Sequence, residues 1–407
     1  QLPVAKTSDT TGDASLDKES LIDMRFMLEH NLKTLEEEEY LAVEIPKTGN
    51  LNYKQQKALE IKNRKPHPYK EQGIKLLGLL QQIAKYSTLL SSHIQGREKY
   101  LHPVSGRIHA GYSQWTETGR LNSYNPNQQN CPKTHSDDFG VRNFHRAPEG
   151  RCLLLADFSG FELRLMAWRA NDKVMLDIFN NGGDMHKTTA AELTGKPIAE
   201  ITKKERQDAK AANFGISYGG TEFALQKTYK VDYGMRKTLD ECLAAVNAVK
   251  RAYPGIPKYQ QDTIVQAREH GYVETIYGYK RTLPDINSSN SFARSQDERR
   301  AANTPIQGSA ADIMKRSQND IYELIGTRAG VWQDVKMIGQ IHDEVILEIP
   351  NDVNTILSLS TQIKAVMEKE PIAGFPVKII ADVSVAEGGW GDKLEFADWL
   401  KMRGVDV

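Results

Sequence analysis

The chain has 407 residues, and its 53 Lys and Arg balance its 53 Asp and Glu, so the formal net charge is zero. Its 39% hydrophobic content is ordinary for a globular protein, and no apolar run approaches the ~18 residues that a membrane span needs. No basic start followed by an apolar stretch indicates a signal peptide. At roughly 100–200 residues per domain, the length predicts about two to four domains or subdomains.

The cysteines favour a reducing, cytoplasmic compartment. Cys131, Cys152 and Cys242 are odd in number and far apart, so they form neither a disulfide framework nor a CxxC zinc pair.

Zero net charge by itself argues against a nucleic-acid-binding protein, but the charge is unevenly distributed. Residues 1–50 carry 5 Lys/Arg and 11 Asp/Glu, a net of −6, with a peak in the run 36–39. Residues 51–150 carry 15 Lys/Arg and 7 Asp/Glu, a net of +8. Two solvated faces would explain this pattern, and so would a basic region that contacts a phosphate backbone.

The first hundred residues read as helical after a flexible start. Residues 1–20 are polar and lack apolar periodicity, which predicts a flexible tail. Apolar residues at three- and four-residue spacings predict helices over 20–42 and 71–95, with a polar, lysine-rich connection between them. Residues 101–150 are rich in Gly, Pro, Asn and Ser, which is typical of short strands and turns.

From residue 151 onward the pattern predicts a mixture of helices and strands. A short apolar run over 152–156 predicts a buried strand that ends at Asp157. Helices are expected over 159–193, 203–230, 238–270 (interrupted near Pro254 and Pro257) and 293–326 (broken around Pro305). Strands are expected over 335–341, 345–349 and 377–385. This order lacks the regular βαβ alternation of a Rossmann fold.

Two aspartates stand at strand ends. Asp157 ends the strand over 152–156, and Asp343 lies in the turn between the strands over 335–341 and 345–349. Carboxylates presented in this way suit hard divalent cations such as Mg²⁺. Two such ions could activate an attacking oxygen and stabilise a leaving one. Unrelated turn or capping aspartates are the alternative that spacing alone leaves open.

A second candidate site is a row on one helix. Arg206, Lys210, Phe214 and Tyr218 are each four residues apart, so their side chains follow one gently spiralling line. Two cations and two aromatic rings in this order fit the phosphates, sugar and base of a nucleotide. The alternative is an amphipathic helix that buries both rings.

Several segments together resemble conserved motifs of the family A DNA polymerases. Residues 157–164 (DFSGFELR) resemble motif A (DYSQIELR), residues 206–219 match motif B (RxxxKxxxFGxxYG) at every fixed position, and residues 341–344 (IHDE) resemble motif C (xHDE). The segments TGRL (118–121), NPNQQN (125–130), DMH (184–186) and NTPIQG (303–308) resemble further family elements. All occur in the family's order and span about residues 100–392.

The resemblance implies a helix-rich, mixed α/β right-hand fold with an antiparallel palm sheet. The expected parts are a tail (1–20), thumb (21–100), first palm segment with motif A (101–171), fingers with motif B (172–290) and second palm segment with motif C (291–407). Basic residues of the thumb are expected to grip the duplex backbone: Lys54, Lys57, Lys62, Arg64, Lys65 and Lys70.

The resemblance also implies site roles. Asp157 and Asp343, with the Phe158 carbonyl, would bind two Mg²⁺ ions, with Mn²⁺ as a substitute, and Glu344 would support them. His186, Arg206 and Lys210 would meet the dNTP phosphates, and Lys210 is also a candidate proton donor to pyrophosphate. Glu162 would crowd the sugar 2′ position. The remaining nucleotide contacts would be Phe158, Ser159, Phe214 and Tyr218. Primer–template contacts would be Arg120, Asn127, Gln129, Asn130, Gly219, Arg299, Asn303, Gln307 and His342.

The implied activity is DNA-templated DNA synthesis by a monomer, with primer–template DNA and dNTPs as partners. We expect no membrane association and no 3′–5′ exonuclease in this chain, and the sequence identifies no processivity partner. A single-subunit RNA polymerase and a catalytically silent DNA-binding scaffold are the alternatives. Glu162 and the TGRL and PNxQN segments argue against the first, and the intact Asp157, Asp343, Arg206 and Lys210 argue against the second.

Two positions in motif A depart from the usual family pattern, and one position in motif B is a site where the family has either Phe or Tyr. Gly160 replaces the usual Gln of motif A, as in some phage members, and Phe158 replaces the usual Tyr. Phe214, rather than Tyr, occupies the motif B position that the family links to acceptance of dideoxynucleotides. We therefore expect discrimination against dideoxynucleotides.

Overall fold

The structure is a computed structural model that describes residues 17–46, 50–132, 137, 139–217 and 219–405. Most of the tail predicted over residues 1–20 thus lies outside the described residues. The chain divides into two compact units: unit one is Gln1–Lys99 with Gln226–Cys242, and unit two is Tyr100–Leu225 with Leu243–Val407. Among the described residues, no helix is both long and apolar enough to cross a membrane. The domain bounds expected from the sequence stay a prediction.

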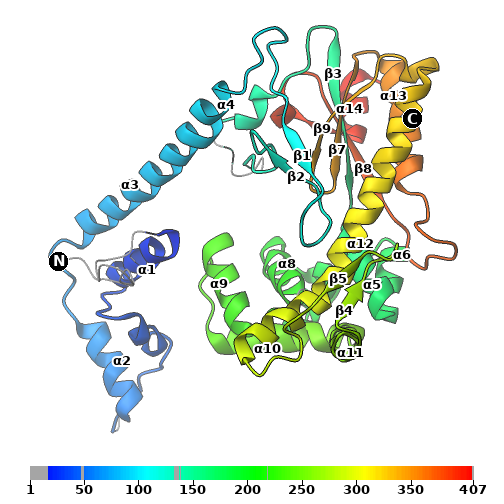
Figure 1. Cartoon of the computed structure of the whole chain (residues 1–407). Helices are drawn as coiled ribbons and strands as arrows, with labels where there is room; N and C mark the ends of the chain where they lie inside the picture. Colours follow the sequence, from blue (N-terminus) through cyan, green and yellow to red (C-terminus); the bar gives the residue numbers. More distant parts are fainter. Residues whose placement is uncertain (1–16, 47–49, 133–136, 138, 218, 406–407) are drawn as a thin grey trace. The chain divides into compact units, whose positions relative to one another are not determined.

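Unit one consists of short helices around two small apolar cores (Figure 1). Its elements are α1 (Lys18–Glu29), η1 (Leu35–Tyr40), α2 (Tyr53–Asn63), α3 (Lys70–Thr88), the π-helical η2 (Leu89–Gln95) and α4 (Gly96–Glu98). One core joins α1 to α3 through Leu21, Met24, Leu28 and Leu77. The other contains Met27, Leu32 and Ile61.

The single helix predicted over residues 20–42 is wrong beyond Glu29. Asn31 adopts a left-handed conformation with a φ of 57°, which ends the helix before the acidic run. The connection predicted after residue 42 contains α2, which begins with a capping box between Asn52 and Gln55. Sequence periodicity missed α2 because it buries only Ala58 and Ile61.

Acidic side chains near the start of the chain pair with the basic segment 226–242. The Asp23 side chain is 7% exposed and accepts hydrogen bonds from Lys230 at 2.7 Å and from Arg236 at 2.8 Å. Glu38 accepts a further bond from Arg236 at 2.6 Å, and Glu19 accepts one from Lys230 at 3.0 Å. Part of the negative charge of the first 50 residues is therefore compensated inside unit one.

The ion pair between Glu37 and Arg64 should make the stability of unit one depend on pH. The two side chains are 21% and 15% exposed, and hydrogen bonds of 2.7 and 2.8 Å join them. The Arg64 hydrogen bonds lower the pKa of Glu37 from 4.5 to about 2. Because the folded-state pKa is depressed, this stabilisation is complete above about pH 4.5 and is lost as the pH falls toward 2.

We therefore expect Glu37→Gln to lower the free energy of unfolding by about 1–2 kcal/mol at pH 7, with the difference shrinking toward pH 2–3. Denaturant unfolding of both proteins across this pH range measures it. Glu29→Gln is the matched control, because it breaks the exposed ion pair between Glu29 and Arg25. Little change in the free energy of unfolding is expected for this variant. A Glu37→Gln effect that stayed constant down to pH 3 would contradict the assignment.

A five-stranded antiparallel sheet organises unit two (Figure 1). Its order is β6 (Lys336–Ile341), β7 (Glu344–Pro350), β3 (Arg151–Phe158), β8 (Ala381–Ala386) and β9 (Leu394–Glu395). The helix α13 (Val353–Met367) packs against β3, β7 and β8 and also contacts α12 (Ser291–Thr327). The sheet buries a core of Cys131, Leu153, Leu155, Ile341, Ile346, Ala386 and Trp390. The predicted helix-rich, mixed α/β class with an antiparallel sheet is confirmed.

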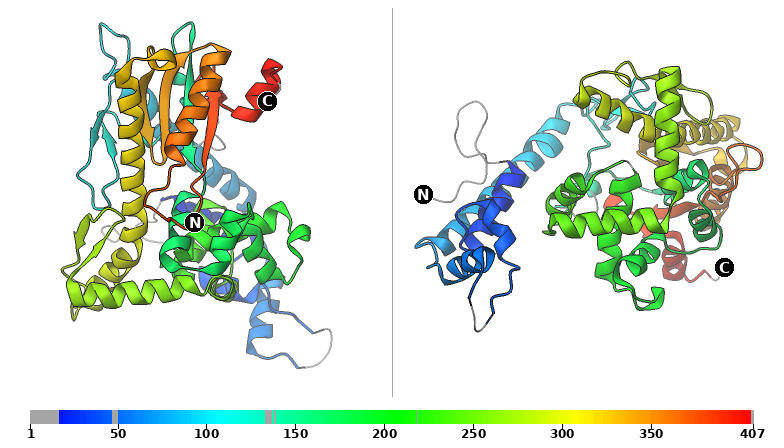
Figure 2. Two further views of the ribbon diagram at one scale, coloured as in Figure 1. Left: turned by 90° about the vertical axis from the view of Figure 1, so that its right-hand side faces the viewer. Right: turned by 90° about the horizontal axis from the view of Figure 1, so that it is seen from below.

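The three helical stretches predicted between residues 159 and 270 are each divided in the structure, and Figure 2 shows them from two further sides. The elements are α5 (Phe161–Ala170), α6 (Lys173–Asn180), α7 (Met185–Thr194), η5 (Ile198–Glu200), α8 (Lys203–Ser217), α9 (Glu222–Asp232), α10 (Leu239–Ala252) and α11 (Gly255–His270). Asn171, with a φ of 44°, ends α5, and Pro254 precedes α11, as the proline signal indicated. The chain crosses from unit two into unit one within α9.

The break predicted around Pro305 is wrong, because α12 runs without interruption for 37 residues. Proline removes one backbone donor from a helix and normally kinks it. Here the Tyr259 hydroxyl donates a hydrogen bond of 3.0 Å to the Ala302 carbonyl, next to the disturbed turn. The carbonyl that loses its ladder donor to Pro305 is that of Ala301, so the Tyr259 bond to the neighbouring Ala302 carbonyl anchors α11 to α12 at this turn rather than replacing the missing bond.

Small elements complete unit two. They are the hairpins β1 (Gly111–Ser113) with β2 (Asn122–Tyr124) and β4 (Tyr272–Glu274) with β5 (Lys280–Thr282), the short helices η4 (Val141–Phe144), η6 (Gly330–Trp332) and η7 (Trp390–Asp392), and α14 (Phe396–Arg403). The sequence analysis did not predict α13, α14 or the β4–β5 hairpin.

Candidate active site

The two aspartates singled out in the sequence meet at one end of the sheet. Asp157 lies on β3 directly opposite Glu344 on β7. Asp343 lies in the two-residue turn between β6 and β7, and its carbonyl accepts a hydrogen bond of 3.2 Å from the Phe158 backbone N–H. Antiparallel pairing of β3 with β7 therefore brings together carboxylates that are 186 residues apart.

The acidic centre carries closely spaced negative charge. Loss of hydration and the nearby Glu344 and Asp343 carboxylates raise the pKa of Asp157 to about 7, although Asp157 is exposed to solvent, which weakens the effect of lost hydration. Burial also raises the pKa of Asp343. Glu344 is 6% exposed and accepts a hydrogen bond of 2.6 Å from Lys393, which was not singled out in the sequence. Lys393 hydrogen-bonds Glu344, and its charge also partly offsets the rise in the pKa of Asp157.

This donor set fits a magnesium site that nucleotide phosphates complete. Among the described residues, no three acidic, histidine or cysteine side chains form a ready-made metal cluster. Mg²⁺ is commonly held by only one or two carboxylates together with substrate phosphates and water. Asp157 and Asp343 supply those carboxylates, whereas Glu344 is engaged by Lys393.

The turn that carries Asp343 is held by buried amides. His342 adopts a left-handed conformation with a φ of 54°, which is uncommon for a residue other than glycine. The Gln340 side chain is 6% exposed and donates to the His342 carbonyl. Gln129 in turn donates to the Gln340 side chain at 3.3 Å and to the Leu121 carbonyl at 3.1 Å. Gln340 thus links Gln129 to His342, two residues that were predicted to contact DNA. Gln340 itself was not predicted from the sequence.

Arg120 and Glu162, predicted for different ligands, form an ion pair. The Glu162 side chain is only 10% exposed, and Arg120 is 34% exposed. Burial and the nearby Asp343 carboxylate raise the pKa of Glu162, and the contact with Arg120 opposes them by favouring the ionised carboxylate. Arg120 thus positions Glu162 beside the acidic centre.

The predicted cationic and aromatic row lies on α8, which packs against α7. Arg206 donates a hydrogen bond of 2.6 Å to Asp184, the residue that caps α7. Farther along α8, the Phe214 ring lies 5.9 Å from the His186 ring, between centroids. The structure therefore brings the DMH element and motif B together, whereas Tyr218 lies outside the described residues.

A buried network orients His186. Asn213, which is fully buried, donates a hydrogen bond of 3.0 Å to Nδ1 of His186. Its side-chain oxygen accepts a bond of 2.8 Å from the Thr189 hydroxyl, which fixes the direction of the amide. Burial, followed by the Arg206 charge, lowers the pKa of His186 to about 4. A neutral His186 therefore carries its proton on Nε2. Asn213 was not predicted, because its role depends on the packing of α7 on α8.

The other predicted DNA contacts fall in two places. Arg299, Asn303 and Gln307 follow one line on α12 at four-residue spacing, and a side chain at Gly219 would lie 4.0 Å from Arg299. Asn127 and the exposed Asn130 belong to the segment after β2, where Asn127 accepts a bond from the Gln129 backbone. Ser159 follows β3, and its N–H donates to the Ile380 carbonyl at 2.8 Å.

The glycine in motif A has a backbone explanation. Gly160 immediately precedes α5 and has a φ of 58°, in the left-handed region. Other L-residues are disfavoured there by about 1–2 kcal/mol. The turn from β3 into α5 thus favours Gly160.

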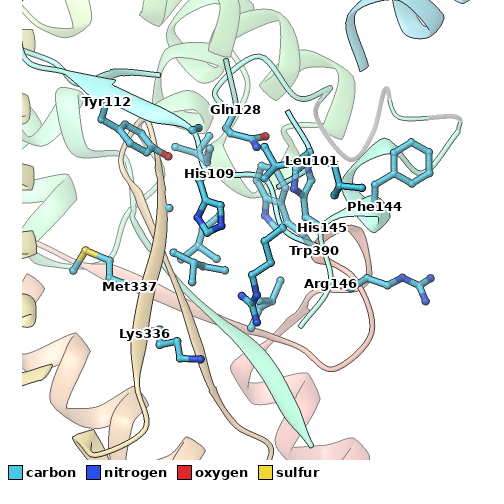
Figure 3. Close-up of a pocket in the computed structure, with 18 of the residues that line it drawn as sticks. Leu101, His109, Tyr112, Gln128, Phe144, His145, Arg146, Lys336, Met337 and Trp390 are labelled. Atoms are coloured by element: carbon cyan, nitrogen blue, oxygen red, sulfur yellow. The ribbon is translucent and has the colours of Figure 1, made fainter. Parts of the chain in front are cut away.

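A cavity of about 600 Å³ lies between the segment 101–112 and the sheet (Figure 3). Its floor includes Leu153 and Trp390, while Lys336, Arg146 and His109 line its polar part. The Tyr112 hydroxyl in its wall accepts a hydrogen bond of 3.3 Å from the Gln340 N–H. This hydrogen bond joins the wall of the cavity to β6, next to the turn that carries Asp343.

Comparisons with known proteins identify the family of the chain. The sequence profile described as DNA polymerase family A matches residues 20–392. DNA polymerase I of Pseudomonas aeruginosa is 39% identical over 284 residues, which cover 70% of this chain and 30% of that protein. DNA polymerase I of Caldicellulosiruptor bescii is 35% identical over 314 residues, covering 77% and 35%. The chain spans about a third of the length of these relatives.

A solved structure described as the POL domain of Pol1 from M. smegmatis, in complex with DNA primer-template and dNTP, is also similar. It matches with a TM-score of 0.70 and 25% identity, over 96% of this chain and 58% of that one. The profile match over most of the chain shows that this protein belongs to DNA polymerase family A.

Proposed function

We propose that the chain is a DNA-templated DNA polymerase module, which extends a primer 3′-hydroxyl with dNTPs and releases pyrophosphate. The observation that carries this proposal is the meeting of Asp157 and Asp343 at the end of the sheet. Similarity to the DNA polymerase I proteins and to a polymerase domain described with DNA primer-template and dNTP supports it.

Asp157, Asp343 and the Phe158 carbonyl would hold two Mg²⁺ ions, for which Mn²⁺ can substitute. When bound, such ions activate an attacking hydroxyl and stabilise the leaving oxygen. Glu344 supports the centre, with its charge held by Lys393.

The nucleotide would bind along α7 and α8. His186, as a neutral donor, meets the phosphates together with Arg206 and Lys210, whose charges compensate the negative charge of the transferring group. In this proposal Lys210 is also the proton donor to the pyrophosphate that leaves. Glu162 excludes a ribose 2′-hydroxyl. The further nucleotide contacts in this proposal are Phe158, Ser159, Phe214 and Tyr218.

The product duplex would lie against unit two with its minor groove toward Arg120, Asn127, Gln129, Asn130, Gly219, Arg299, Asn303, Gln307 and His342. Minor-groove acceptors occur in both A·T and G·C pairs, so these contacts test the shape of a pair without reading its sequence.

In the proposed thumb, Lys54, Lys62 and Lys65 are exposed and suit phosphate contacts. Lys57, Arg64 and Lys70 already bond within unit one. We propose that the module works as a cytoplasmic monomer.

Extension of a labelled primer with Mg²⁺ and either dNTPs or rNTPs tests the proposal. Extension of the primer with dNTPs but not with rNTPs supports the proposed DNA polymerase activity. Preferential use of rNTPs would identify an RNA polymerase, and DNA binding without extension would identify a scaffold.

Phe214→Tyr should increase acceptance of dideoxynucleotides. The Phe214 ring has no hydroxyl to replace the 3′-hydroxyl that a dideoxynucleotide lacks, so the parent should discriminate against these substrates. One gained hydrogen bond, worth about 1 kcal/mol or more, predicts at least a roughly fivefold rise in the ddNTP/dNTP ratio of kcat/KM. Single-nucleotide incorporation measures this ratio, and equal discrimination by the two proteins would rule out the role of Phe214.

A further inference from the structure

The loop between β1 and β2 carries the most exposed large hydrophobic side chain among the described residues. Trp115 is 96% exposed, whereas Trp332, Trp390 and Trp399 are at most 4% exposed. Full exposure of an indole ring is unusual in a folded protein and often marks a contact surface.

Hydrogen bonds define the backbone around Trp115. The backbone N–H of Trp115 donates to the Ser113 hydroxyl at 3.2 Å, and the backbone N–H of Thr116 donates to the Gln114 carbonyl at 2.9 Å. The Thr116 hydroxyl closes the loop with a bond of 2.7 Å to the Arg120 carbonyl. The indole is therefore presented by a structured loop, which lowers the entropy lost when it binds a partner.

The base of this loop packs on α12 and β5, and its cations are paired with carboxylates, as in the Lys315–Asp312 pair at 3.4 Å. Glu117 is paired with Arg281 of β5, so its charge is compensated. A side chain at Gly119 would lie 3.5 Å from the Lys315 ammonium, and one at Gly308 would lie 3.4 Å from the Thr118 carbonyl. With the charges below it paired, the loop presents a neutral, exposed aromatic ring, which suits the flat bases of a nucleic acid and can pack on them without regard to sequence.

The position of Trp115 along the chain limits which part of the DNA it can reach. It lies five residues before Arg120, so the two Cα atoms are at most about 17 Å apart. Arg120 contacts Glu162 beside the acidic centre. At about 3.4 Å per base step, the distance from Trp115 to Arg120 corresponds to at most roughly five base steps, so Trp115 can reach only the stretch of duplex close to Arg120.

We propose that Trp115 is a DNA contact that packs its indole into the minor-groove side of the newly formed duplex, within about five base pairs of the primer terminus. The proposal rests on the DNA polymerase function proposed above. An apolar side chain can wedge against base steps from the minor groove, and the indole N–H can donate to the acceptors there. The contact is neutral and independent of sequence, and it would hold the primer end in register.

Intrinsic fluorescence of the full chain tests the contact directly. Primer–template DNA without dNTPs should quench part of the parent's tryptophan emission, and this part should be missing in Trp115→Phe. A duplex shortened to eight base pairs from the end distant from the primer terminus should still quench it. Anisotropy of labelled DNA measures binding independently.

Affinity supplies a second readout. Trp115→Ala should raise the Kd for primer–template about tenfold, and Trp115→Phe should recover most of that loss. The dependence of Kd on salt should keep its slope in both variants, because no cation is removed. Tyr322→Ala, which removes an aromatic ring that is 68% exposed on α12, is the matched control and should bind like the parent.

The outcomes separate this inference from the proposed function. If DNA binds and the primer is extended but Trp115 emission and the affinity of Trp115→Ala do not change, the contact is refuted and the polymerase function stands. If the parent neither binds nor extends primer–template, the proposed function fails together with the contact.

Discussion

Asp343→Asn should reduce primer extension at least about 10³-fold, which corresponds to about 4 kcal/mol of transition-state stabilisation. The substitution keeps the size of the side chain and removes the negative charge that would hold Mg²⁺ beside Asp157. Binding of primer–template should persist, because Asp343 is not itself among the proposed duplex contacts and the substitution keeps the size of its side chain. Single-turnover extension at saturating DNA and dNTP, together with anisotropy of labelled DNA, separates the two effects.

A neighbouring carboxylate provides the matched control. Asp382 on β8 lies opposite Asp157 on the other side of β3 and is exposed, but no motif contains it. Asp382→Asn therefore removes the same charge next to the same strand and should reduce extension less than about tenfold. Comparable losses in both variants would show that general electrostatics dominate, and full activity of Asp343→Asn would overturn the metal assignment.

The residues of the acidic centre could be predicted because each is presented by local sequence. An apolar strand ending at Asp157 and a tight turn containing Asp343 are patterns of a few residues. The partners that tune them are not local: Lys393 is 49 residues from Glu344, and Gln129 is 211 residues from Gln340. Such pairs depend on how the strands and loops pack, which spacing along the chain does not encode.

The same distinction separates correct from incorrect predictions of the fold. Sequence periodicity located the main helical regions, but one left-handed residue, Asn31, ended a helix that the pattern continued. At Pro305 the pattern predicted a break, but α12 continues through this residue and is anchored to α11 by the Tyr259 bond to the neighbouring Ala302 carbonyl. In one case the backbone ended a favourable pattern, and in the other a helix packed against another helix continued through an unfavourable residue.

Asn213→Asp should lower kcat/KM for dNTP and should also change how kcat/KM depends on pH. In the parent, the Asn213 amide donates to Nδ1 of His186, so Nε2 carries the proton and can donate to a phosphate. An aspartate in its place accepts a hydrogen bond instead. A neutral His186 then carries its proton on Nδ1 and turns a lone pair toward the phosphates, which predicts a loss of about 10²-fold in kcat/KM for dNTP near pH 8.

The carboxylate also raises the pKa of His186 above the value of about 4 that burial and Arg206 produce in the parent. Below the raised pKa both ring nitrogens are protonated and the Nε2 donor returns. Activity of Asn213→Asp should therefore recover as the pH falls from 8 toward 6, whereas the parent shows no such recovery. Nitrogen chemical shifts of His186 report which ring nitrogen carries the proton in each protein.

Asn213→Ala and the His186→Gln background complete this test. The alanine variant loses the orienting bond without a new charge, so its kcat/KM should fall about tenfold with no additional pH dependence. In His186→Gln, the pH-dependent part of the Asn213→Asp effect should disappear, because the group that titrates is gone. If aspartate and alanine gave the same pH profile, Asn213 would support the packing of α7 on α8 without controlling the proton on His186.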